Sequence, residues 1–164
     1  MTSVTPDIVF RVVNTVALVA WLTLIILPGR RWVTTTVTGS LVPMLFATLY
    51  IAIVVTTFGG AEGSFATLSG VAELFTNRWL LLAGWVHYLA FDLLIGTWEA
   101  GDAEDRGVPH ALLVPCLLLT FIFGPAGWLL YRMVRVRYNA PRTGSRPDPN
   151  GPGPDLTPMD RVQT

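Results

Sequence analysis

Charged residues are scarce in this sequence, and their scarcity excludes an ordinary soluble domain. Only 13% of the 164 residues are charged, whereas soluble domains carry about 25%. Hydrophobic residues make up 52% of the chain, and the mean hydropathy is +0.54. This composition indicates a membrane protein.

Cysteine and net charge set two further limits. Cys116 is the only cysteine, so an internal disulfide and a zinc finger are both excluded, while the redox compartment stays open. The basic residues are all arginine, and eleven of them balance eleven acidic residues. A net charge of zero gives no support to nucleic-acid binding, which needs a clustered basic face.

The apolar residues are gathered in runs that are long enough to cross a bilayer. About twenty helical residues match a hydrocarbon core of about 30 Å. The first run exceeds the apolar segment of a signal peptide and is followed by no cleavage site. We therefore predict an all-α integral membrane four-helix bundle in residues 1–138, with spans over residues 8–27, 41–58, 79–98 and 110–133.

The segments between the spans carry their own predictions. Residues 68–75 fit a short interfacial helix, and Gly124-Pro125 inside the fourth run predicts a kink. The acidic stretch from Glu99 to Arg106 is expected to form a loop between antiparallel spans. That arrangement would bring His110 level with Glu99.

The C-terminal residues 139–164 have a different composition from the spans. Prolines interleaved with glycines and charged residues cannot bury a core, so we predict a disordered cytoplasmic tail. With four spans both termini share one side, and seven of the arginines near the spans fall on that side against three opposite. The excess predicts a multi-pass cell-membrane protein with both termini in the cytoplasm.

Ionisable side chains inside the third run supply the candidate site. An aspartate near a helix centre costs roughly 2.5–3.5 kcal/mol on insertion scales, so such a group usually faces a bundle interior or a wet cavity. Asp92 and Glu99 share one stripe of a helix, and His87 lies about 140° round from Asp92. We expect His87 and Asp92 to flank one cavity. The predicted catalytic set is His87, Asp92, Glu99, Asp102 and His110.

The same residues allow other interpretations. Proton transfer suits carboxyl and imidazole groups in an apolar setting, but nitrogen and oxygen atoms also bind metals, so a metal and any cofactor stay open. His87 could instead be a hydrogen-bonded packing residue, and Asp92 an interhelical contact. Glu99 and Asp102 could be solvated loop residues, and His110 a helix-start residue.

Several motifs together resemble the neoxanthin-synthase-like membrane proteins, the abscisic-acid-deficient type. They are residues 84–93, Asp102, Pro109-His110, residues 115–117 and residues 123–127. The resemblance implies the fold of that family and places His87, Asp92, Asp102 and His110 at its recurrent polar positions. Plant members are implicated in forming neoxanthin from violaxanthin. This chain has Thr97 where plant relatives carry an arginine five residues after the aspartate.

Two functions follow as the main hypotheses, beside a third possibility, a proton-coupled small transporter, which would need oligomerisation because four helices enclose little space. The first is an enzyme that isomerises or rearranges a carotenoid or other isoprenoid lipid by acid/base chemistry in the membrane. The second is a non-catalytic membrane subunit that binds a lipid or a partner, with His87 and Asp92 as interhelical polar contacts. The expected partners are the lipid bilayer, an apolar isoprenoid or carotenoid ligand, and a second copy of the chain or another membrane protein.

Overall fold

The computed structural model describes residues 4–27 and 29–138, and these residues form helices and turns with no strand. The all-α prediction is confirmed for this part of the chain. The predicted tail, residues 139–164, lies outside the described residues. The first predicted span is the helix α1 (Pro6–Ile26), which carries Pro6 in its first turn, where a missing N–H costs little.

The second long helix begins eight residues before its predicted start at Leu41. A π-helical segment, η1 (Val33–Leu41), leads directly into α2 (Val42–Thr57) and the short turn η2 (Phe58–Gly60). Threonine and serine are poor helix formers, but here their hydroxyls bond to backbone carbonyls one π-turn earlier. Thr38 Oγ1 donates to the Val33 carbonyl at 3.1 Å, and Ser40 Oγ donates to the Thr35 carbonyl at 2.8 Å.

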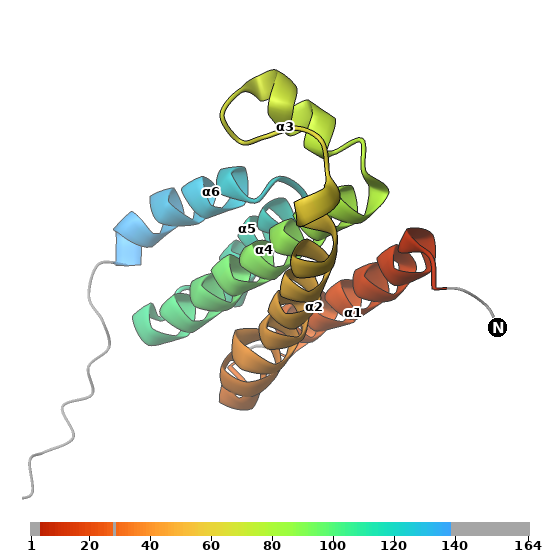
Figure 1. The fold of residues 1–164 in the computed structure, drawn as a ribbon. Coiled ribbons are helices and arrows are strands. Elements are labelled where there is room, and N and C mark those ends of the chain that lie inside the picture. Colours follow the sequence, from red (N-terminus) through yellow and green to blue (C-terminus); the bar gives the residue numbers. More distant parts are fainter. Residues whose placement is uncertain (1–3, 28, 139–164) are drawn as a thin grey trace, which may run out of the picture.

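The long helix α4 (Arg78–Arg106) is the centre of the fold. It contacts α1, α2, η1, α5 and α6 (Figure 1). Asn77 caps its start, since its Oδ1 accepts the N–H of Trp79 at 2.9 Å. Gly107 ends it with a left-handed φ of 69°.

The acidic stretch Glu99 to Arg106 is helical, so its prediction as a loop is wrong. Alanine, glutamate and arginine in this stretch are good helix formers. Arg106 Nε also pairs with Asp102 one turn earlier at 3.0 Å. Helix propensity and this ion pair together extend α4 by two turns beyond the predicted end of the span.

The predicted short helix is present as α3 (Leu68–Leu74). Thr67 caps it by accepting the N–H of Gly70 at 3.0 Å. In Figure 1 this helix stands beyond the end of α2.

The fourth predicted span, residues 110–133, is two helices that fold back on each other. The helix α5 (His110–Phe123) ends at Gly124, which has a φ of 37°, and α6 (Pro125–Arg135) then returns to the short turn η3 (Val136–Tyr138). In Figure 1 α6 runs back alongside α5. The expected kink is therefore a reversal.

Gly127 allows the two helices of this hairpin to touch. A Cβ at Gly127 would overlap the backbone and hydroxyl of Thr120 in α5, so only glycine fits this contact. In a continuous helix these residues would lie about 10 Å apart along the axis. The hairpin thus takes the place of the single fourth helix that was predicted, and α5 alone, at about 21 Å, is shorter than the apolar core of a bilayer.

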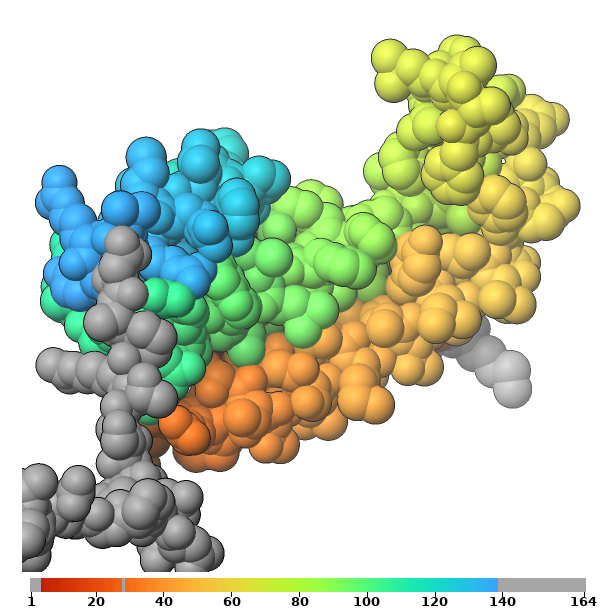
Figure 2. Space-filling model, turned by 90° about the vertical axis from the view of Figure 1, so that its left-hand side faces the viewer, coloured from red at the N-terminus to blue at the C-terminus, as the bar shows by residue number. Residues whose placement is uncertain are grey.

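The reversal places the start of α1 and the end of α6 at opposite ends of the helices. At one end Asp7 pairs with Arg78 at the start of α4. At the other, Arg135 of α6 pairs with Asp102 near the end of α4 at 3.2 Å. Figure 2 shows α6 in blue at one end of the molecule and the α3 segment in yellow at the other.

Candidate functional site

Asp92 lies at the midpoint of α4, fourteen residues from each end, and faces the turn between α5 and α6. It is 9% exposed. Its carboxyl group occupies the space of a side chain at Gly124, because a Cβ there would lie 2.6 Å from Oδ1. Its other oxygen, Oδ2, is buried and has no hydrogen-bond partner among the described residues. Asp92 therefore packs directly against the reversal of the chain.

Glu99 lies two turns further along the same stripe and is fully buried. The Thr120 hydroxyl of α5 hydrogen-bonds its carboxyl group, at 3.0 Å from Oε1 and 3.1 Å from Oε2. Because Gly127 presses on Thr120 from α6, this one hydrogen bond ties α4 to both arms of the hairpin.

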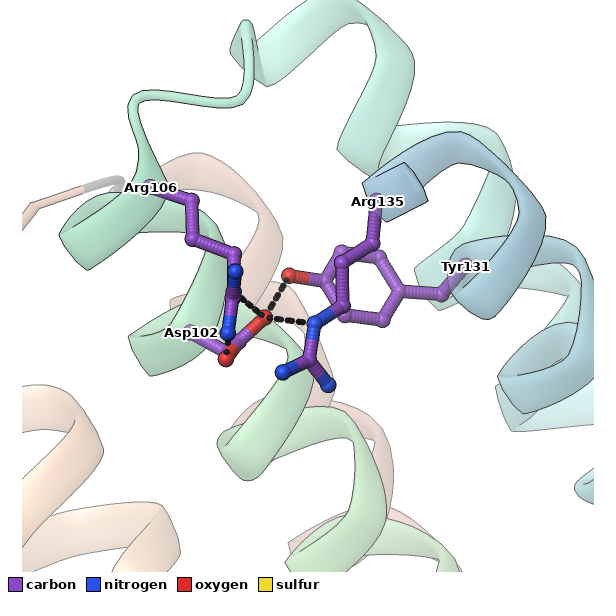
Figure 3. Close-up of polar contacts among 4 residues, drawn as sticks. All are labelled: Asp102, Arg106, Tyr131 and Arg135. Atoms are coloured by element: carbon purple, nitrogen blue, oxygen red, sulfur yellow. Dashed lines mark hydrogen bonds and ion pairs between the residues drawn. The ribbon is translucent and has the colours of Figure 1, made fainter. Parts of the chain in front are cut away.

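Asp102 contacts two guanidinium groups and one phenol at the end of the hairpin away from Gly124 (Figure 3). Arg106 Nε lies 3.0 Å from both carboxylate oxygens, and Arg135 Nε lies 3.2 Å from Oδ2. The fully buried Tyr131 donates its hydroxyl to Oδ2 at 2.6 Å. Trp98 packs edge to face on Tyr131 and lies under the Arg135 guanidinium at 5.4 Å. Charge-assisted bonds of this kind are among the strongest in proteins.

His87 is on a different face of α4. Its ring packs on Tyr50 of α2, with centroids 5.5 Å apart, and on Phe91, at 4.6 Å. It is exposed to a cavity of about 390 Å³ between α2, the α3 segment and α4. The rest of the lining is apolar or aromatic: Tyr50, Val54, Phe58, Phe65, Leu74, Phe75, Leu80, Ala83 and Gly84.

His110 lies at a third place, in the first turn of α5. It lines a smaller cavity of about 130 Å³ together with Glu104, and its Nδ1 is buried without a hydrogen-bond partner among the described residues. His110 is not level with Glu99, because α4 continues through the acidic stretch and brings Thr120 opposite Glu99 instead.

The structure thus separates the predicted catalytic set. Asp92, Glu99 and Asp102 form one row along α4 that faces the hairpin, which we call the acid row. His87 and His110 line two other cavities. The shared cavity expected for His87 and Asp92 is not formed, because the turn at Gly124 fills the space beside Asp92 while His87 faces α2. Their roles in proton transfer stay predictions.

Sequence reasoning missed the partners of the acid row: Thr120, Tyr131 and Arg135. The Asp102 and Arg106 spacing signals one ion pair. The contacts from α6 had no such signal, since they exist only when the chain reverses at Gly124. Within the described residues no group of three or more His, Cys, Asp or Glu side chains could hold a metal ion.

The fold defines the class of the protein. Three described helices, α1, the run from η1 to η2 and α4, are long and apolar enough to cross a bilayer, which indicates a membrane protein. The chain belongs to the ABA4-like family, described as ABA DEFICIENT 4-like, whose model matches residues 8–131. This match confirms the resemblance drawn from the sequence motifs. No curated protein and no solved structure matches the chain.

The contact between Tyr131 and Asp102 predicts a specific loss of stability. Tyr131→Phe removes one hydrogen bond to a charged acceptor in a buried site, so we expect the free energy of unfolding to fall by about 1.5 kcal/mol or more. Denaturant unfolding in detergent measures this. Tyr50→Phe is the matched control, because the Tyr50 hydroxyl makes no hydrogen bond within the described residues. Equal effects of the two variants would contradict the assigned role of Tyr131.

Proposed function

We propose that the protein binds the apolar chain of a carotenoid or other isoprenoid lipid in the cavity beside His87 and isomerises or rearranges it there. One observation carries the proposal: this cavity is apolar on nearly every side and has a single histidine in its wall. Its volume of about 390 Å³ lies in the usual range for small-molecule sites, roughly 300–1,000 Å³. The family resemblance supports the same class of ligand.

A histidine suits this chemistry because imidazole gains and loses a proton near neutral pH. The imidazolium form of His87 donates its proton to one carbon of a double bond, and a carbocation forms on the chain. The neutral ring then takes a proton from a neighbouring carbon, so the double bond moves and His87 returns to its starting form. No oxidant or reductant is consumed. The Tyr50 ring, whose centroid lies 5.5 Å from that of His87, is an aromatic group that would stabilise a positive charge developing over its face.

The position of His87 fits a reaction inside the bilayer. It lies nine residues after Arg78, which corresponds to about 13 Å along α4. With α4 crossing the bilayer, an isoprenoid chain reaches this depth with its long axis among the lipid tails. The acid row has a separate task in this proposal, because its carboxyl groups face the hairpin.

A second candidate function is lipid binding without chemistry. It is favoured by the absence, within the described residues, of a hydrogen bond that would orient the His87 ring. In that case the cavity holds its ligand unchanged, and the protein acts as a binding subunit.

The two functions predict different behaviour of His87→Gln, which keeps a polar side chain but cannot act as an acid and base near neutral pH. For an enzyme, we expect the variant to retain its co-purified lipid, while the pigments and isoprenoids of a complemented deletion strain resemble those of the deletion. Thr48→Val is the control, since Thr48 is exposed and bonds only to the Met44 carbonyl. Full complementation by His87→Gln would rule out the proposed proton transfer. If the purified protein carries bound lipid while the deletion strain has the same pigments and isoprenoids as the wild type, the binding function is established instead.

We also propose a revised membrane topology. Three helical segments cross the membrane: α1, the run from η1 to η2, and α4. The hairpin of α5 and α6 follows α4, and both of its ends lie at the same end of the helices. That end carries most of the arginines of the described residues: Arg30, Arg31, Arg106, Arg132, Arg135 and Arg137. The other end has Arg11 and Arg78. The positive-inside rule places the arginine-rich end in the cytoplasm. The expectation that both termini are cytoplasmic depended on four complete crossings, and this proposal replaces it.

Two exposed valines test the topology. Val4 precedes α1 and is 68% exposed, and Val136 follows α6 and is 62% exposed. In intact cells we expect a membrane-impermeant maleimide to label Val4→Cys but to label Val136→Cys only after permeabilisation. The native Cys116 is fully buried, so the protein without an added cysteine gives the background labelling. Labelling of both positions from the same side would contradict the proposed topology.

A further inference from the structure

A groove separate from the His87 cavity lies between the start of α5 and the end of α6. It has a volume of about 260 Å³ and is lined by Leu112, Met133, Val134, Arg137 and Tyr138. Leu112 and Met133 are exposed hydrophobic residues, with 42% and 59% of their surface accessible. The groove therefore combines apolar side chains with one guanidinium group and one phenol.

No carboxylate of the described residues balances the charge of this groove. Arg137 is exposed and has no carboxylate within 4.0 Å among the described residues. Arg135, two residues earlier, by contrast pairs with Asp102. An uncompensated arginine next to exposed apolar side chains favours a ligand that carries both an anionic group and a hydrocarbon chain.

The helix that carries the groove has the composition of a membrane-interface helix. Trp128, Leu129 and Met133 of α6 are exposed, and Arg132 lies over the Trp128 ring at 5.5 Å. Tryptophan and arginine at one helix surface are typical of the level of lipid headgroups. In the proposed topology this level belongs to the cytoplasmic leaflet, whose surface is negatively charged.

We propose that the groove is a binding site for an anionic phospholipid. An acyl chain lies against Leu112, Met133 and Val134, and the guanidinium of Arg137 binds the phosphate through paired N–H groups. The site joins the two ends of the hairpin, so the bound lipid stabilises α6 against α5. The inference is independent of the chemistry proposed at His87.

Thermal unfolding of the full-length protein in detergent tests this site. We expect phosphatidylglycerol to raise the unfolding temperature more than phosphatidylcholine does, and the difference to shrink at high salt, because binding to the folded state stabilises it and salt screens the ion pair. Inorganic phosphate alone should give no shift, since it lacks the chain that fills the groove. Equal shifts with the two lipids, or an equal shift with phosphate, would overturn the proposal.

Two arginines of the same helix end provide the matched variants. Arg137→Gln should weaken phosphatidylglycerol binding by about fivefold or more, the effect of one basic side chain at an anionic surface. Arg132→Gln removes an equal charge outside the groove and should retain most of the affinity. Native mass spectrometry of bound lipid measures both. An equal loss in the two variants would show general surface attraction and would refute a defined site.

Discussion

The attachment of the α5 and α6 hairpin to α4 depends on two hydrogen-bonded carboxyl groups, Glu99 and Asp102, on the helix face that also carries Asp92. Asp92 packs on the turn, Glu99 accepts the Thr120 hydroxyl, and Asp102 binds groups from α6. Of these three acids only Asp102 has cations beside it among the described residues, and of the three it lies nearest the end of the helix. The three contacts lie at the tip, the middle and the base of the hairpin. The two bonded contacts, at Glu99 and Asp102, tie to α4 two helices that are each too short to span a bilayer.

This use of one face leaves another side of α4 for a ligand. His87 faces α2 and the α3 segment, where aromatic and aliphatic side chains surround a cavity without an ion pair. The proposed function assigns the proton transfer to this histidine and none to the carboxyl groups. The separation of the carboxyl groups from the cavity histidine is the observation on which the proposed function depends.

Sequence reasoning predicted the elements of the fold better than their connections. Long apolar runs located α1, α2 and α4, and the glycine and proline at residues 124–125 marked the place where the helix is interrupted. The direction of the chain after Gly124 was not predictable, because it depends on the fit of Gly127 to Thr120 and on partners of Asp102 about thirty residues away. Helical spacing correctly placed Asp92 and Glu99 on one stripe. It could not show which neighbouring helix packs on each face of α4, so the prediction that His87 and Asp92 flank one cavity was wrong.

The distance between the start of α5 and the end of α6 tests the reversal most directly. Spin labels on Leu112→Cys and Met133→Cys report it by pulsed electron resonance in lipid bilayers, with the buried Cys116 unlabelled. Because both residues line one groove, the hairpin predicts a short distance, in the range of neighbouring helices. A single continuous helix would separate them by about 32 Å. A measured distance near that value would contradict the reversal of the chain at Gly124.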